Sequence, residues 1–234
     1  MSKIKNKFWD LYHYRRNIQI NKDKNFDICF IWIPKSAGTS VYKTISEHAG
    51  MRLLKKPKEF MNFDNQGVVT FGHVHYLSLL RDGFVSKKYH DNSYKFSIVR
   101  NPYERVASLY NYLAQGSRIK GWDFDRFLYE VENNRPPIGL YNTHAISHAN
   151  PQADWIIDQK SQFIVDDVFK LDKMDELHAK LNTDYNLSIN SWKKENISPK
   201  IVTFEENILN HKNRIDLINR VYRKDFDLFD FKKI

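Results

Sequence analysis

The stretch FDICFIWIPKSAGTS, residues 26–40, decides the fold of this chain. Residues 28–33 form a short, continuously apolar run rich in isoleucine and aromatic side chains, which is typical of a buried β-strand. A turn of small residues with one lysine, Lys35, follows this run. Apolar residues then recur at helical spacing over residues 41–49, so we expect a helix to begin near residues 39–40. The stretch therefore predicts a strand, a turn and a helix in succession.

The turn between this strand and this helix has the features of an anion-binding loop. The first turn of a helix presents backbone N–H groups and a positive dipole end to an anion, and Lys35 adds a full positive charge. The phosphate loop of ATPases reads Gly-x-x-x-x-Gly-Lys-Ser/Thr, whereas here the lysine precedes the glycine. An ordinary tight turn is the alternative interpretation. We expect a nucleotide phosphate to be held by Lys35, Ser36, Ala37, Gly38, Thr39 and Ser40.

Length and composition indicate a single globular domain. The chain has 234 residues, of which 41% are hydrophobic and 28% charged, which is ordinary for a globular protein. No apolar run is long enough for a transmembrane helix, and the N-terminus lacks the apolar region of a signal peptide. Cys29 is the only cysteine. We therefore expect a cytoplasmic protein with one domain over residues 26–234.

The net charge of +9 is concentrated at the N-terminus. Residues 1–25 hold seven Lys or Arg and two Asp, with aromatic residues interleaved. Such a basic, aromatic extension suits peripheral contact with an acidic membrane surface, and less readily a nucleic acid. A solvated extension that packs one or two aromatic side chains on the domain is the plainer alternative.

The rest of the chain alternates strand and helix patterns. Strands are expected at 68–71, 95–99 and 162–165, and a loop-rich link at 81–93. Asn101 and Pro102 carry the signature of a helix N-terminus, and Gly116 follows the expected end of that helix. Further helices are predicted around 123–131, around 174–181, and from the Thr203–Glu206 capping box through one long final helix. This order predicts an α/β fold with a mainly parallel central sheet flanked by helices.

Three chemically useful side chains follow three of the predicted strands. Lys35, His73 and Arg100 each lie just past the carboxyl end of a strand. The carboxyl ends of parallel strands share one edge of a sheet, where ligands bind. We expect these three side chains to meet there; a chance arrangement, since loops are rich in polar residues, is the alternative.

Two segments resemble the donor-binding motifs of sulfotransferases that use 3′-phosphoadenosine 5′-phosphosulfate (PAPS). PKSAGTS, residues 34–40, resembles their 5′-phosphosulfate loop, and FSIVRNPYERVASLY, residues 96–110, resembles their 3′-phosphate-binding segment. Arg100 and Ser108 hold that segment's eight-residue spacing. Arginine offers a charge-assisted fork to a phosphate and serine a neutral donor. The resemblance implies a P-loop-like nucleotide-binding fold; for Arg100, a surface ion pair with Glu104 is the alternative.

The resemblance is greatest to the carbohydrate O-sulfotransferases, a group that includes heparan 2-O- and chondroitin-type enzymes. TFGHVHY, residues 70–76, is similar to the Gly-His segment that bears their catalytic base, and residues 148–152 and 222–229 are similar to two later patterns. The resemblance implies PAPS as co-substrate, 3′-phosphoadenosine 5′-phosphate (PAP) as product, no metal, and a glycan or glycolipid acceptor. The resemblance implies that a basic loop closes over the nucleotide. This loop contains Lys193, Lys194, Ser198 and Lys200.

The resemblance also implies roles in catalysis. His73 is expected to be the general base that takes the acceptor's proton, because imidazole titrates near neutrality. Lys35 is expected to stabilise the charge that develops on the leaving phosphate oxygen. His75 is the alternative base or a substrate-side residue, and Gln152 is a second substrate-side candidate.

Two other functions compete with this hypothesis. One is a kinase-like phosphotransferase with an atypical phosphate loop, which predicts magnesium-dependent ATP binding. The other is a non-catalytic module that binds nucleic acid or membrane through residues 1–25, which predicts steep salt dependence and no effect of Lys35→Ala.

Overall fold

A computed structural model describes Arg16, Ile20 and residues 26–61, 67–141, 144–193 and 201–234. The proposed basic extension, residues 1–25, therefore lies almost entirely outside the described residues. Among the residues that were described, no helix combines the length and apolar character that crossing a membrane requires.

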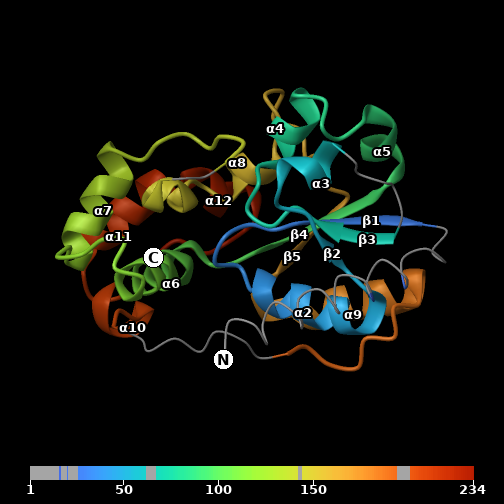
Figure 1. Cartoon of the computed structure of the whole chain (residues 1–234). Helices are drawn as coiled ribbons and strands as arrows, with labels where there is room; N and C mark the ends of the chain where they lie inside the picture. The colour runs from blue at the N-terminus through green and yellow to red at the C-terminus, as the bar shows by residue number, and fades with distance from the viewer. Residues whose placement is uncertain (1–15, 17–19, 21–25, 62–66, 142–143, 194–200) are drawn as a thin grey trace, which may run out of the picture.

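The core of the fold is one sheet of five parallel strands (Figure 1). The strand order is β2-β3-β1-β4-β5. Every neighbouring pair is parallel, which confirms the predicted parallel α/β fold. The strands are β1 (Asp27–Ile31), β2 (Arg52–Leu53), β3 (Gly67–Thr70), β4 (Tyr94–Val99) and β5 (Asp167–Lys170).

Helices cover both faces of the sheet, which explains why β1 is continuously apolar. Ile28 and Phe30 pack toward one face, and Cys29 and Ile31 toward the other. The first face is covered by α2 (Gly38–Ala49) and α9 (Met174–Tyr185). The second face is covered by α4 (Tyr76–Arg81), α5 (Lys87–Asn92) and α8 (Ala153–Ile156). The short helix α3 (Pro57–Met61) places Phe60 in the same apolar cluster.

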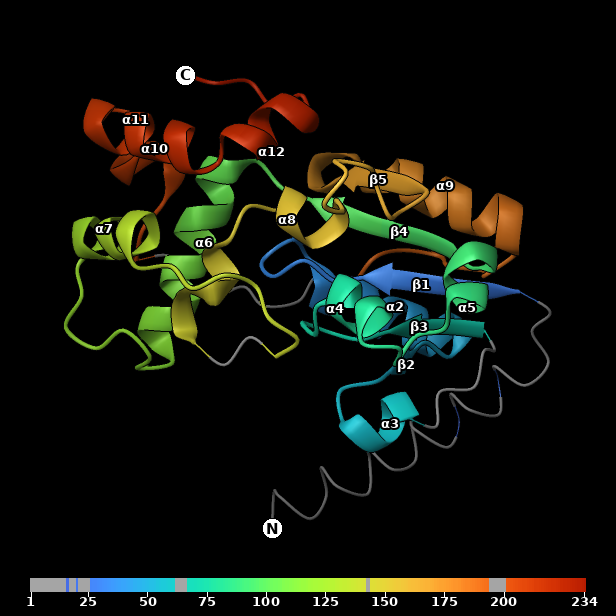
Figure 2. The ribbon, with the colours of Figure 1, turned by 90° about the horizontal axis from the view of Figure 1, so that it is seen from above.

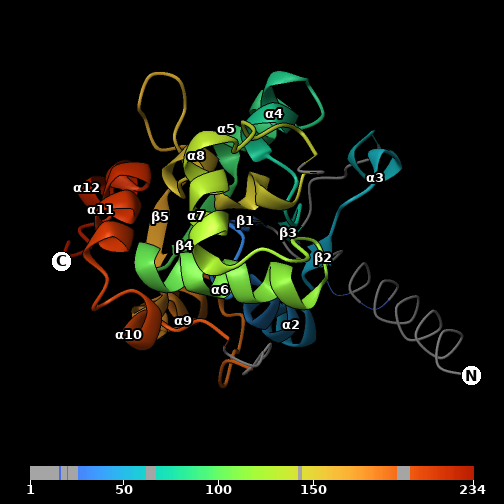
Figure 3. The same ribbon diagram turned by 90° about the vertical axis from the view of Figure 1, so that its left-hand side faces the viewer.

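A separate group of helices faces the carboxyl edge of the sheet (Figure 2). Figure 3 views the molecule from this end, with α6 and α7 in the foreground. These helices share an apolar cluster of their own. They are α6 (Pro102–Gln115), α7 (Phe124–Asn133), α10 (Phe204–Asn207), α11 (Lys212–Val221) and α12 (Arg223–Leu228). Two 3₁₀ turns, η1 (Ala145–Ala149) and η2 (Leu171–Lys173), complete the fold.

Helix α6 begins as the sequence predicts. The Asn101 side chain accepts a hydrogen bond of 3.0 Å from the Tyr103 backbone N–H, and Pro102 is the first helical residue. The helix ends at Gln115, immediately before Gly116. Because α6 starts directly at the end of β4, it carries its first residues across the carboxyl edge of the sheet.

Three predicted elements differ in the structure. The strand expected at 162–165 is wrong: within it only Phe163 forms an isolated bridge, to Ile157, the chain then turns, and β5 follows at Asp167. The apolar run at 162–165 packs over the core from that turn, whereas the edge strand β5 buries only Phe169 fully. Edge strands need little apolar character, which is why the pattern missed it.

The link at 81–93 and the final helix are the other two corrections. The link contains α5, whose N-cap Ser86 accepts a hydrogen bond from the Tyr89 N–H. The Thr203 capping box begins only the four-residue α10, because helical hydrogen bonding stops at Ile208. The apolar periodicity beyond it comes from α11 and α12, which bury their apolar sides in the same cluster.

Candidate active site

The ends of β1, β3 and β4 bring the predicted site residues to one cavity. Its volume is about 460 Å³, and it lies at the carboxyl edge of the sheet beside α6. It is lined by Lys35, His73, Arg100 and Ser108, which come from three separate segments of the chain. None of the described residues that line it is acidic. The lining residues are Trp32, Pro34, Lys35, Ala37, Gly38, Thr39, Ser40, His73, Arg100, Ser108, Tyr112, Gln115, His148 and Leu171.

The loop from β1 to α2 has the backbone of an anion cradle. Lys35 and Ala37 adopt left-handed conformations with φ of 67° and 57°, and alternating handedness in successive residues turns backbone N–H groups inward. Ala37 is the N-cap of α2 and offers no side-chain cap. The first N–H groups of the helix, from Gly38 onward, therefore keep their capacity to bind an anion. β1, this loop and α2 together form a P-loop-like unit.

Gly38 is required by the close approach of Trp32. A Cβ atom at position 38 would lie 1.8 Å from the indole Nε1 and 2.1 Å from its Cδ1. The same indole ring packs between Phe30 and Tyr42, and its edge meets the His73 ring at a centroid distance of 5.0 Å. Trp32 thus links the cradle to the histidine across the cavity.

Lys35 lies in a partly desolvated, cationic environment. Its Nζ atom sits 4.5 Å from the centroid of the Tyr112 ring on α6, which is within the range of a cation–π contact. Burial, and then repulsion from Arg100, lower the pKa of Lys35 to about 8. The side chain is therefore mostly charged at neutral pH, and it loses its charge unusually readily.

Arg100 lies just before α6 and Ser108 lies in its second turn, and both line the cavity. The Nε atom of Arg100 donates to Glu104 Oε2 over 3.1 Å, so the ion pair expected as the alternative role does form. That pair is on the outside of the helix, where Glu104 is exposed. A surface pair of this kind is weak, and it does not remove Arg100 from the cavity wall.

His73 is held in a defined tautomer. Its Nδ1 atom lies 3.4 Å from the Trp32 carbonyl oxygen, and a proton donated there leaves the lone pair of the neutral ring on Nε2. Burial is the main cause that lowers the pKa of His73 to about 4, with Lys55, Lys35 and Arg105 adding positive charge. The imidazole is therefore neutral at pH 7, as a base requires.

A second imidazole, that of His148, lies beside His73. The two ring centroids are 4.9 Å apart. Burial, followed by repulsion from His73 and nearby arginines, lowers the pKa of His148 to about 3. The cavity therefore holds two neutral imidazoles close to one charged lysine.

Residues 148–153 are held in place by hydrogen bonds to buried polar side chains. Asp225 on α12 is fully buried and accepts 2.9 Å hydrogen bonds from the N–H groups of Gln152 and Ala153. Gln152 is also fully buried. Its Oε1 accepts from Ser36 Oγ at 3.1 Å and from the Arg100 N–H at 2.8 Å. Gln152 therefore lies beneath the cradle and does not line the cavity.

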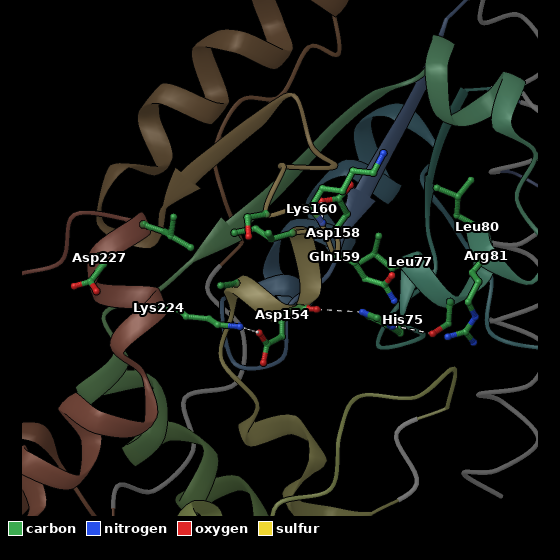
Figure 4. A pocket seen from close by; sticks show the side chains of 15 residues that line it. His75, Leu77, Leu80, Arg81, Asp154, Asp158, Gln159, Lys160, Lys224 and Asp227 are labelled. Atoms are coloured by element: carbon green, nitrogen blue, oxygen red, sulfur yellow. Dashed lines mark hydrogen bonds and ion pairs between the residues drawn. The ribbon is translucent and has the colours of Figure 1, made fainter.

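His75 lies in a different cavity from His73. Its Nδ1 is 2.9 Å from Ser78 Oγ and its Nε2 is 3.2 Å from the Asp154 carbonyl oxygen. Figure 4 shows this second cavity, of about 870 Å³, between α4, α8 and α12. Lys224 pairs with Asp154 at its edge, at 3.2 Å. The larger cavity is mostly apolar, and its six charged residues balance: three basic and three acidic.

No group of three or more His, Cys, Asp or Glu side chains among the described residues is arranged to hold a metal ion. Of the basic loop at 193–200, only Lys193 is described, so the prediction that this loop closes over a nucleotide lies outside the described residues.

The fold and the cavity define a parallel α/β protein with a cavity of cationic lining at the carboxyl edge of its sheet. The chain belongs to the sulfotransferase family, whose family model matches residues 17–232. The family predicted from the two sequence motifs is thereby confirmed. The match carries no information on a carbohydrate acceptor.

Two solved structures are similar to the chain at low identity. One is a sulfotransferase from Alicyclobacillus acidocaldarius, with a TM-score of 0.43 and 13% identity over 88% of this chain and 99% of the other. The second is mouse sulfotransferase SULT7A1 complexed with PAP, with a TM-score of 0.44 and 17% identity over 92% of this chain and 86% of the other. No curated protein matches the chain.

Sequence reasoning missed several lining residues. Tyr112 and Gln115 follow Ser108 by four and seven positions, so they share one face of α6 and could have been found from helical spacing. His148 belongs to a pattern that was recognised without a role. Trp32 and Leu171 gave no such signal, because apolar residues next to a strand ordinarily belong to the core.

Proposed function

We propose that this protein transfers a sulfuryl group from PAPS to a hydroxyl group of a glycan or glycolipid. The observation that carries the proposal is the meeting of Lys35, His73, Arg100 and Ser108 at one cavity with no acidic residue among its described lining. Membership of the sulfotransferase family supports sulfuryl transfer. The glycan or glycolipid acceptor rests on the sequence resemblance alone.

The cavity suits a donor with two phosphate groups. The backbone of residues 36–40 and Lys35 are suited to the 5′-phosphosulfate, because left-handed loop residues and an uncapped helix start favour an anion. Arg100, just before α6, and Ser108, in the second turn of that helix, are suited to the 3′-phosphate. PAPS would thus span from the loop to α6.

The chemistry needs a base on one side of the sulfur and a cation on the other. His73 would take the proton of the acceptor hydroxyl at Nε2 as the oxygen–sulfur bond forms. The sulfur–oxygen bond to the 5′-phosphate breaks, and its electron pair stays on the phosphate oxygen, where Lys35 stabilises the new charge. The low pKa of His73 in the absence of donor partly reflects Lys35 and other cations. The donor's negative charge would offset them and make the imidazole a stronger base.

The basic extension, residues 1–25, gives the proposal a second part. Seven basic residues and interleaved aromatic ones would let the protein contact an acidic membrane surface from outside, where glycolipid acceptors lie. Vesicle sedimentation with and without residues 1–25, using anionic and neutral phospholipid vesicles, tests this part separately.

Transfer of labelled sulfate from PAPS to a panel of glycans and glycolipids tests the central proposal. We expect transfer to at least one acceptor, with PAP released in equal amount. A kinase-like enzyme would instead transfer labelled phosphate from magnesium-ATP and leave PAPS intact. That result, together with no binding of PAP, would contradict the proposal.

A further inference from the structure

Arg105 is a buried cation that the reaction chemistry described above does not use. It is the fourth residue of α6, with 2% of its surface exposed, and it does not line the cavity. Among the described residues no carboxylate forms an ion pair with it. Burying a guanidinium without a contacting carboxylate is costly unless its N–H groups form hydrogen bonds. The hydrogen-bond partners of Arg105 therefore show which segments it holds.

The partners of Arg105 are three backbone carbonyl groups from two distant segments. Its Nε donates to Pro34 at 3.0 Å, in the anion cradle. Its Nη1 donates to Asn150 at 3.1 Å, and its Nη2 to His148 at 2.8 Å. One rigid planar group therefore joins the start of the cradle to the segment that carries the second imidazole of the cavity.

Gln152 joins the same two segments a second time. Its buried side chain accepts from Ser36 Oγ and from the Arg100 N–H, and its own backbone is held by Asp225. The cradle is thus tied to residues 148–152 through Pro34 and through Ser36, on either side of Lys35. Lys35 itself has a left-handed backbone, a conformation that a non-glycine residue keeps only when its surroundings impose it.

We propose that Arg105 and Gln152 are positioning residues that hold the anion cradle and the His148 segment as one unit. Lys35, between the two ties, then keeps both its strained backbone and its distance from the imidazole pair. The proposal rests on the proposed function in that its probe is PAP, the desulfated donor. Because neither side chain lines the cavity, an effect of its replacement on PAP binding would act through the backbone segments that it holds and not through contact with PAP.

Arg105→Lys tests this role. Lysine keeps the charge, but its compact ammonium group cannot reach three diverging carbonyls as a guanidinium fork does. We expect the dissociation constant for PAP, measured by calorimetry, to rise about 10- to 100-fold, since displacing a binding group by about 1 Å can cost on the order of 10²-fold.

Arg214→Lys is the matched control. Arg214 also donates three hydrogen bonds, two to Asp125 and one to the Asn207 carbonyl, but on α11, away from the cavity. This variant should lower the melting temperature and leave the affinity for PAP within about twofold of wild type. A loss of affinity that merely follows a loss of stability would appear in both variants and would overturn the positioning role.

Gln152→Met provides a second test that does not depend on the folding of Arg105→Lys. Methionine fills a similar volume but removes the ties to Ser36 and Arg100, so the affinity for PAP should again fall about tenfold or more. If the wild type binds PAP and either folded variant binds it equally well, the positioning role is wrong while the proposed function stands. If the wild type itself does not bind PAP, the proposed function is contradicted.

Discussion

The cavities around His73 and His75 differ in size and in chemistry, and the smaller of the two carries the features of an active site. The larger, about 870 Å³, surrounds His75 with apolar residues and balanced charges. The smaller, about 460 Å³, gathers Lys35, Arg100 and two imidazoles, without a described acidic residue in its lining. Volume alone would select the larger cavity, which lacks this concentration of positive charge.

His73 and His75 line different cavities although they are close together in the sequence. They are two positions apart, yet His73 faces the Trp32 carbonyl and the cradle, while His75 is bound by Ser78 and the Asp154 carbonyl. Burial lowers the pKa of both. The charges around them differ: Lys55, Lys35 and Arg105 act on His73, whereas Arg81 and Asp154 act on His75.

Replacing His73 gives the largest expected effect. His73→Ala should lower kcat about 10²- to 10⁴-fold, because a general base contributes on that scale. PAP binding should change little, since the cradle and α6 remain intact. Rates of sulfate transfer to the best acceptor of the panel, with calorimetry for PAP, measure both quantities.

His75→Gln is the control for that variant. Glutamine keeps polar atoms near Ser78 and the Asp154 carbonyl, so turnover should stay within a few-fold of wild type. Should His75→Gln abolish turnover while His73→Ala does not, the base would belong to the larger cavity, and the two cavities would exchange roles.

Arg100 distinguishes donors with and without a 3′-phosphate. Arg100→Ala should weaken PAP binding about 10- to 100-fold, since a hydrogen bond to a charged group contributes roughly 1.5–3 kcal/mol. AMP lacks the 3′-phosphate, so its affinity should fall by no more than a few-fold. Equal weakening of both ligands in calorimetry would remove Arg100 from the 3′-phosphate site.

The dependence of kcat/KM on pH should reflect both groups of the smaller cavity. His73 must be neutral, and its pKa of about 4 places the loss of activity on acidification near that pH. Lys35 must be charged, and its pKa of about 8 places the alkaline loss near pH 8.

Lys35→Arg sharpens the assignment of the alkaline limb. A guanidinium stays protonated up to a pKa of about 12 or more, so this variant should lose the fall near pH 8, whatever its absolute rate. An unchanged alkaline limb would show that another group controls it.

Gly38→Ala gives the smallest expected effect. The added methyl group would meet the Trp32 indole at about 2 Å, and overpacking of this kind costs about 1–3 kcal/mol. The melting temperature should fall by several degrees. Gly116→Ala is the control, because its Cβ would meet only ordinary contacts at 3.5 Å and beyond; a similar fall in both variants would contradict the role of Trp32.

The strands that end at the site were predictable, because each is a buried strand bounded by a turn. The runs that end near Lys35, His73 and Arg100 place these residues at one edge as soon as the sheet is recognised as parallel. The edge strand β5 was not predictable, because Phe169 is its only buried residue and one buried residue gives no pattern. The four-residue helix α10 was mistaken for the start of a long helix. Thr203 does cap it, as predicted, but tertiary packing determines where it ends.

The supports beneath the site were beyond sequence reasoning. Arg105 lies within the segment that resembles a 3′-phosphate-binding motif, residues 96–110, yet its partners, Pro34 and residues 148–150, are distant in sequence. Asp225, too, reaches Gln152 from another helix. A buried polar side chain is recognised only when the groups that satisfy it are known, and those come from the three-dimensional structure.

Binding of PAP to the wild-type protein, measured by calorimetry and located by a crystal structure of the complex, tests the central claim most directly. We expect one PAP per chain, with its 5′-phosphate on residues 35–40 and its 3′-phosphate at Arg100 and Ser108. PAP bound instead in the cavity around His75, or no binding at all, would contradict the account.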